Sequence, residues 1–202
     1  MGYTTDFIGH VLIDPPLNAE EADYLTAFTR ARHWDRPGGP YVLPDHLLEP
    51  RATVDVETYN RVAEGKPGLW CPWTPCLDGH CLTFDGMEKA YSAVSWMTYL
   101  IETFLAPGAR VSEVPDPLFD GFTFDHRCDG VVAASRRDSG ELSLIVVTDN
   151  EVERIVVVPG VPDGVPWGEL PYQAETDRYL RHRQARQAAW RRRLAELRPE
   201  TA

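Results

Sequence analysis

The stretch between residues 67 and 108 constrains the fold more than any other part of the chain. It holds three of the six Trp and three of the four Cys, and reads PGLWCPWTPCLDGHCLTFDGMEKAYSAVSWMTYLIETFLAPG. Its Asp78-Gly79 pair lies between two runs of aromatic and β-favouring residues. That pattern predicts a β-hairpin with a two-residue turn, whose central residues both need φ > 0. A regular turn would pair Trp73 with Phe84.

Strand alternation assigns the hairpin residues to two faces of a sheet. Cys76 and Cys81 fall opposite each other on the outer face, together with Thr74 and Thr83. We expect the other face to be the core face because it is the more apolar one. Its residues are Cys71, Trp73, Leu77, His80, Leu82 and Phe84.

Four hairpin residues have the chemistry of zinc ligands, since cysteine thiolates and histidine nitrogens form tetrahedral zinc sites. They are Cys71, Cys76, His80 and Cys81. Their C-x4-C-x3-H-C spacing differs from the C-x2-C pairs of common zinc motifs. A regular hairpin also places Cys71 and His80 on one face and the other two thiols on the opposite face. We therefore expect no cofactor and interpret the hairpin cysteines as buried or paired thiols. A bound zinc ion is the alternative.

An amphipathic helix is predicted directly after the hairpin. Asp85 is a suitable N-cap and Glu88 completes a capping-box pattern. Pro107-Gly108 is a stop signal. The apolar face recurs at helical spacing and comprises Tyr91, Val94, Met97, Leu100, Ile101, Phe104 and Leu105. Such a stripe indicates core packing.

The remaining segments predict an α+β fold. Residues 3–13 alternate as a strand, and a helix capped by Asn18 and Glu21 follows. Residues 33–68 are rich in Gly and Pro and are expected to be loop, with a short strand at 52–59. Four further strands, separated by turns that include Asp129-Gly130, are predicted at 122–128, 131–136, 142–148 and 152–158. This order predicts a mostly antiparallel sheet with helices on one face, a ferredoxin-like split unit followed by a β-meander.

Charge divides the chain unevenly. The last 28 residues, 175–202, which we call the tail, carry eight Arg against four acidic residues, a net charge of +4. The whole chain carries −11, so the preceding 174 residues carry −15. We expect an α+β domain at 1–158, a Pro-rich linker at 159–174 and a basic amphipathic helix at 175–198.

Several partners fit the tail. It can bind nucleic acid, dock on the acidic part of its own chain, or mediate self-association as a homo-oligomer. The candidate contact residues are Arg186, Trp190, Arg191, Arg192 and Arg193. An acidic domain repels nucleic acid but suits a basic protein surface.

The compartment expected from the sequence is the cytoplasm. No apolar run approaches the ~18 residues that span a bilayer, and the first residues lack the pattern of a signal peptide. Four cysteines without a secretion signal favour a reducing environment.

Several short motifs resemble a family of small uncharacterised bacterial proteins with relatives in tailed phages and prophages. The motifs are MGYTTDF, PGLWCPW, DGMEKAY, WMTYLIETFLAPGA and TDNEV, within roughly residues 1–156. The resemblance implies a compact cytoplasmic α+β domain and brings no activity or catalytic residues. Cys76 and Cys81 stand outside the family pattern, which weakens the zinc interpretation.

The leading hypothesis from the sequence is a non-enzymatic protein-interaction module, either phage- or defence-related. The sequence contains no P-loop, dinucleotide fingerprint or nucleophile elbow. The alternative is a metal-binding or hydrolase-like protein centred on Cys71, His80 and His126, with Glu88 near the histidines. A satisfied structural histidine is the competing interpretation of His126.

Overall fold

The computed structural model describes residues 4–44 and 55–161, together with Arg178, Arg181, Ala185 and Ala188 of the tail. The chain divides into two compact units, Met1–Val161 and Pro162–Ala202. We call the first unit the body. Among the described residues, no helix combines the length and apolar content needed to cross a membrane.

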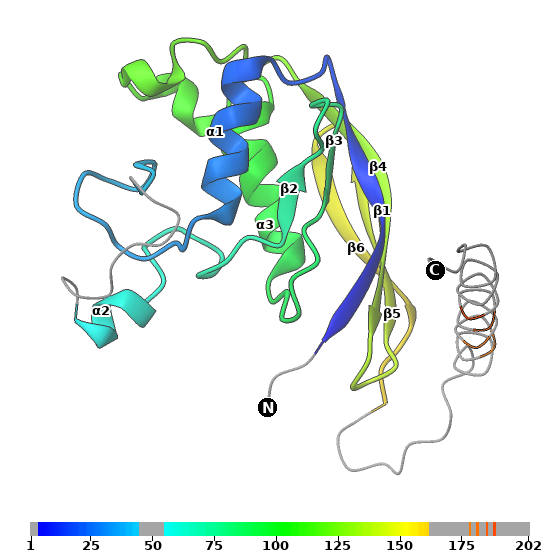
Figure 1. Ribbon diagram of the computed structural model, residues 1–202. Helices are drawn as coiled ribbons and strands as arrows, with labels where there is room; N and C mark the ends of the chain where they lie inside the picture. Colours follow the sequence, from blue (N-terminus) through cyan, green and yellow to red (C-terminus); the bar gives the residue numbers. More distant parts are fainter. Residues whose placement is uncertain are drawn as a thin grey trace, which may run out of the picture. The chain divides into compact units, whose positions relative to one another are not determined.

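The body contains six strands and a small number of helices (Figure 1). The strands are β1 (Thr5–Asp14), β2 (Trp73–Pro75), β3 (Cys81–Phe84), β4 (Arg127–Arg136), β5 (Leu142–Thr148) and β6 (Glu151–Val158). The α-helices are α1 (Ala19–Arg30), α2 (Val56–Asn60) and α3 (Ala93–Leu100). A π-helix, η2 (Ile101–Leu105), continues α3, and two 3-10 helices follow it, η3 (Arg110–Glu113) and η4 (Pro117–Phe119).

All six strands form one sheet in the order β2-β3-β1-β4-β5-β6, and every neighbouring pair is antiparallel. The first four strands, with α1 and α3 as the two crossover helices, have the order of a ferredoxin-like split βαβ unit. Strands β5 and β6 extend that sheet as a meander. The predicted α+β fold class is therefore confirmed.

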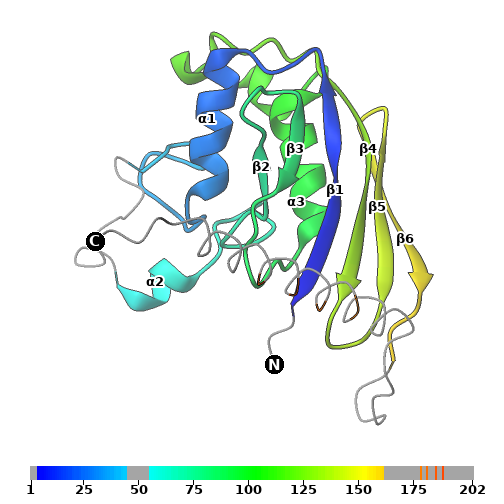
Figure 2. The ribbon, with the colours of Figure 1, turned by 45° about the vertical axis from the view of Figure 1, so that its right-hand side comes forward.

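The two long helices lie on one side of the sheet (Figures 1 and 2). Helix α1 begins with the predicted capping box, because the Asn18 side chain accepts from the Glu21 amide and the Glu21 carboxylate accepts from the Asn18 amide. Helix α1 packs against β2, and α3 contacts both β2 and β6. The opposite side of the sheet is called the open face below.

The core lies between these helices and the sheet. The fully buried apolar side chains of α3 and η2 are Trp96, Met97, Leu100, Ile101, Phe104 and Leu105. They face Val11, Trp73 and Val132 of the sheet within one continuous apolar cluster. The predicted apolar stripe therefore forms the core, apart from Tyr91, which is exposed.

The predicted hairpin register is confirmed, but the predicted face of its turn is wrong. Trp73 pairs with Phe84, but β2 ends at Pro75 and β3 begins only at Cys81, so strand alternation does not continue into residues 76–80. Leu77 is fully exposed and His80 is exposed. The backbone of Gly79, with φ of 71°, instead packs against Leu17, whose N–H donates to the Gly79 carbonyl.

The start of the central helix also differs from the prediction. Asp85 does not cap a helix; its carboxylate accepts from the Met87 amide, two residues on, in a local turn that includes Gly86 at φ of 90°. Helix α3 begins eight residues later, after Ser92, which has φ of 58° and makes no side-chain capping bond. The capping-box pattern at Asp85 and Glu88 thus reflects the tendency of Asp to form such turns.

Two predicted strands are wrong. The predicted strand at 52–59 is replaced at its C-terminal end by α2, whose N-cap Asp55 accepts from the Thr58 amide; residues 52–54 lie outside the described residues. The predicted strand at 122–128 is interrupted by Phe124 at φ of 51°, and regular pairing starts at Arg127.

The predicted turn at Asp129-Gly130 is wrong because β4 runs through it. Gly130 pairs with Val11 on one side and Val147 on the other. A Cβ atom at Gly130 would lie 2.5 Å from the His10 carbonyl oxygen and 2.8 Å from the Val11 Cα. The glycine therefore permits a close strand approach, a role that a turn signal in the sequence does not distinguish.

We expect Gly130→Ala to destabilise the body by about 1–3 kcal/mol, because the added methyl group would force β1 and β4 apart. Gly68→Ala is the matched control, since a Cβ there meets its nearest atom, Trp96 Nε1, at an ordinary 3.4 Å. Urea denaturation monitored by Trp fluorescence measures both. Equal stability of the two variants would contradict the close-approach explanation.

Candidate functional site

The most extensive candidate site is the open face, because aliphatic side chains form a continuous row across it. Ile8 of β1 pairs with Ala133 of β4, Ala133 pairs with Leu144 of β5, and Leu144 pairs with Ile155 of β6. Ile8 is 77% exposed and Ile155 is 42% exposed. A second row contains Val131, which is also exposed.

The apolar surface extends to the outer strand of the sheet. The exposed aliphatic side chains of the open face are Ile8 and Leu12 of β1, Val131 of β4, and Ile155 and Val158 of β6. Aliphatic rows of this kind normally belong to the buried face of a sheet, and contiguous exposed ones are typical of interaction surfaces. The face can therefore bury a complementary apolar surface.

Acidic side chains accompany these aliphatic rows. Glu153 lies opposite Val146 in the second row, and Asp129 lies opposite Leu12. Asp129 forms an ion pair with Arg127, while Glu151 and Glu153 are exposed on β6. The surface thus combines apolar contact area with negative charge, which suits a partner that is both apolar and basic.

The hairpin cysteines occupy two separate environments. The Cys71 thiol is buried and lies 3.5 Å from the Trp73 carbonyl oxygen, to which it donates. The Cys76 thiol donates to the Asp78 carboxylate and its sulfur accepts from the Cys81 amide at 2.8 Å. The structure thus brings Cys76 and Cys81 together and places His80 on the surface. Over residues 4–44 and 55–161, no group of three or more His, Cys, Asp or Glu is arranged to hold a metal ion.

His126 lies in a buried polar cluster with Glu21. Its Nδ1 donates to the Pro15 carbonyl at 2.7 Å, and its Nε2 lies 3.1 Å from Glu21 Oε1. The same carboxylate oxygen accepts from the amide and hydroxyl of Thr123. Both side chains of the pair are 1% exposed. His80 and Glu88, which the sequence grouped with His126, are instead exposed.

This cluster joins two segments that are distant in the sequence, residues 15–21 and 123–126. Burial alone would raise the pKa of Glu21, but hydrogen bonds from the Thr123 and Asn18 amides, and from the His126 and Thr123 side chains, outweigh it and lower that pKa. The carboxylate is therefore ionised and saturated with donors. Because no substrate can reach an enclosed pair of this kind, its role is to fix the start of α1 against residues 121–126.

A second polar group, Lys66, lies in an aromatic cage. Its ammonium lies 4.6 Å from the Phe28 and Tyr99 ring centroids and 5.0 Å from that of Tyr41, and it donates to the Tyr99 hydroxyl at 2.5 Å. These rings stabilise a cation through their π faces. Burial nevertheless lowers the pKa of Lys66 to about 7, with a further contribution from the Arg36 charge.

His33 packs beside the cage, between the rings of Phe28 and Trp96 at 4.6 and 4.7 Å. Burial, with the charges of Lys66 and Arg36, lowers its pKa to about 3. Its Nε2 has no hydrogen-bond partner. No local sequence pattern predicts this assembly, because residues 28, 33, 66 and 99 come together only in the folded body.

The tail residues proposed from the sequence, Arg186, Trp190 and Arg191–Arg193, lie outside the described residues. Within the predicted 175–198 helix, Arg178, Arg181, Ala185 and Ala188 are described, and all four are helical and exposed.

Comparison of the chain with protein-family models, with curated proteins and with solved structures gives no match. The functional proposals below therefore depend on the geometry and charge of the described residues.

We expect Glu21→Gln to lower the free energy of unfolding by about 2–3 kcal/mol, because it removes a charge that accepts four hydrogen bonds in the interior. Asp23→Asn, which changes an exposed carboxylate of the same helix, should change it by less than about 0.5 kcal/mol. Urea denaturation at pH 7 provides the comparison. A loss of similar size in both variants would show that the cluster contributes little.

We also expect the free energy of unfolding to rise between pH 7 and pH 9.5, because the folded state lowers the pKa of Lys66. The folded state releases its proton near pH 7, whereas the unfolded chain holds it until about pH 10.4. The unfolded state therefore binds more protons across this range, and the unfolding free energy should increase by about 3 kcal/mol.

Lys66→Met should remove this rise, and Lys89→Met, at the only other lysine, should retain it. Denaturation midpoints measured across the pH range test both variants. A wild-type midpoint that does not change from pH 7 to 9.5 would contradict a destabilised ammonium in the cage.

Proposed function

We propose that the chain is a cytoplasmic, non-enzymatic protein-interaction module whose binding surface is the open face. The observation that carries this proposal is the row from Ile8 through Ala133 and Leu144 to Ile155, which presents aliphatic side chains to solvent across four strands. Burying such a surface is favourable by about 25 cal/mol per Å2.

The partner we infer is a basic amphipathic helix of another protein. The aliphatic row offers an apolar contact for one face of a helix. Asp129, Glu151 and Glu153 offer opposite charges for Lys or Arg on its flanks. The excess negative charge of the first 174 residues would attract such a ligand over longer distances.

Two features support the non-enzymatic and cytoplasmic parts of the proposal. His33 and His126 are 2% and 1% exposed, so neither imidazole is available to a substrate at the surface. Cys71, Cys76, Cys81 and Cys128 are free thiols, a state that a reducing compartment maintains.

A defined probe tests the proposal. A synthetic peptide with the sequence of residues 175–198 is basic and carries an imperfect apolar stripe that includes Tyr179, Leu180, Trp190 and Leu194. We expect a fragment of residues 1–161, which corresponds to the compact body, to bind this labelled peptide saturably in fluorescence anisotropy. Binding should weaken as salt rises, because salt screens the charge contacts.

Val131→Lys should weaken peptide binding about tenfold or more, since it places a like charge at the centre of the surface. Leu77→Lys is the matched control, because Leu77 is equally apolar and fully exposed but lies in the hairpin turn. Equal effects of the two variants would contradict the proposed surface. Dimerisation of the fragment without peptide binding would contradict the basic-helix partner.

A further inference from the structure

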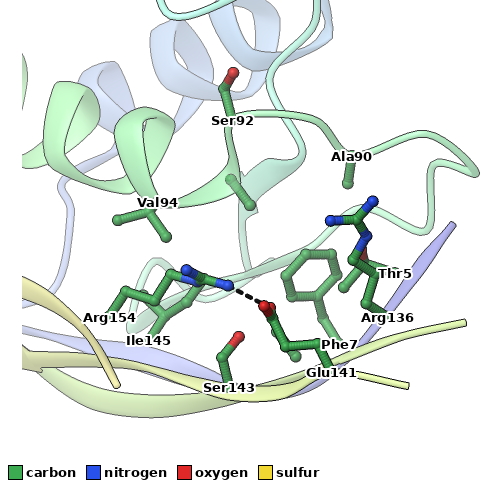
Figure 3. A pocket seen from close by; sticks show the side chains of 12 residues that line it. Thr5, Phe7, Ala90, Ser92, Val94, Arg136, Glu141, Ser143, Ile145 and Arg154 are labelled. Atoms are coloured by element: carbon green, nitrogen blue, oxygen red, sulfur yellow. Dashed lines mark hydrogen bonds and ion pairs between the residues drawn. The ribbon is translucent and has the colours of Figure 1, made fainter. Parts of the chain in front are cut away.

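A small pocket lies on the opposite side of the sheet from the open face, where α3 begins (Figure 3). Its volume is about 300 Å3. The floor is apolar and includes Phe7 of β1, Ala134 of β4 and Ile145 of β5. Ala93 and Val94, in the first turn of α3, form part of the roof.

Polar groups converge on this apolar floor from the sheet. Figure 3 shows the side chains of Arg154, Glu141 and Ser143 rising into the space below α3. Arg154 donates to the Glu141 carboxylate, and that contact holds the guanidinium at the pocket. A guanidinium has five N–H donors, so one contact with Glu141 leaves others for a ligand.

The position of the Ser143 side chain indicates that the pocket binds a ligand. The residue is only 4% exposed, and its hydroxyl points into the pocket (Figure 3). The hydrogen bonds found within residues 4–44 and 55–161 include none to this hydroxyl. The hydroxyl oxygen therefore opens onto the pocket, where its O–H can donate to an acceptor on a ligand.

Hydrogen-bond donors and a helix dipole at the pocket suit an anion. Arg136 and Arg154 both line the pocket, and each is paired with a carboxylate, Arg136 with Asp138 and Arg154 with Glu141. The first turn of α3 adds the positive end of a helix dipole, and no side chain caps it. A ligand carboxylate would therefore accept from the guanidinium donors of Arg154 that Glu141 does not use, close to the positive end of α3.

We propose that this pocket binds a small monocarboxylic acid with an apolar group. The carboxylate accepts from Arg154 and the Ser143 hydroxyl near the start of α3, and the apolar group lies on Phe7 and Ile145. At the ~30 Å3 that a water molecule occupies in the liquid, the volume accommodates about ten non-hydrogen atoms. The ligand class is thus a short-chain or aromatic acid rather than a nucleotide.

Phenylacetate is a suitable probe, with phenylacetamide as its uncharged counterpart and inorganic phosphate as an anion without an apolar group. We expect the full chain to bind phenylacetate saturably, with a Kd of about 1 mM, a value ordinary for a ligand of this size. Two-dimensional NMR titration gives the affinity and the location together. The largest shifts should fall on the amides of Ser143, Ile145 and Ala93.

Ser143→Ala and Arg154→Lys should each weaken phenylacetate binding about tenfold, because each removes hydrogen bonds to a charged group. Ser143→Ala removes only a hydroxyl, so it should fold normally. Arg137→Gln is the matched control, since Arg137 pairs with Asp6 and does not line the pocket. Val131→Lys should also bind phenylacetate normally, which separates this site from the open face.

Three results would overturn the proposal. The first is shifts that do not saturate, or that fall on other residues. The second is equal affinity for phenylacetamide, which would show that no carboxylate is recognised. The third is tighter binding of inorganic phosphate than of phenylacetate, which would show that the apolar floor does not contribute.

Discussion

The packing of α3 and η2 against one face of the sheet is the interaction on which the rest of the body depends. Six fully buried apolar side chains of α3 and η2, among them Trp96, Leu100 and Phe104, fill the space above Val11 and Val132. A two-layer domain needs one such apolar contact to form its core. Because α1 and α3 both pack on this one face, the opposite face of the sheet is available for contacts with other molecules.

This one-sided arrangement produces two chemically distinct surfaces. The open face presents aliphatic rows with acidic neighbours, which suits a macromolecular partner with basic and apolar groups. On the other face, which the helices cover, α3 starts only at Ala93 and does not reach the end of the sheet that carries Arg136 and Glu141. The pocket around Ser143 lies in the space that remains. Ser92, whose backbone is in the left-handed region, directly precedes the first residue of α3. The two surfaces are thus consequences of where the helical layer lies and where it begins.

Local chemistry made part of this fold predictable. The Asn18–Glu21 capping box and the Trp73–Phe84 register follow from interactions between residues close in sequence. The errors occurred where a local signal had two physical meanings. Asp-Gly at 129–130 marks a close strand contact instead of a turn, and Asp85 forms a local turn instead of a helix cap. The sites were less predictable still, because Glu21 meets Thr123 and His126, and Lys66 meets Phe28 and Tyr99, only through tertiary packing.

Methyl NMR with a water-soluble paramagnetic agent distinguishes the buried apolar face of the body from the binding-competent one. The experiment uses residues 1–161 with labelled Ile and Val methyl groups. We expect strong broadening of Ile8, Val131 and Ile155, little broadening of Val132 and Ile145, and protection of the first three when a basic amphipathic peptide is added. Equal protection of Ile8 and Ile145 in the free fragment, or no protection by the peptide, would contradict this distinction.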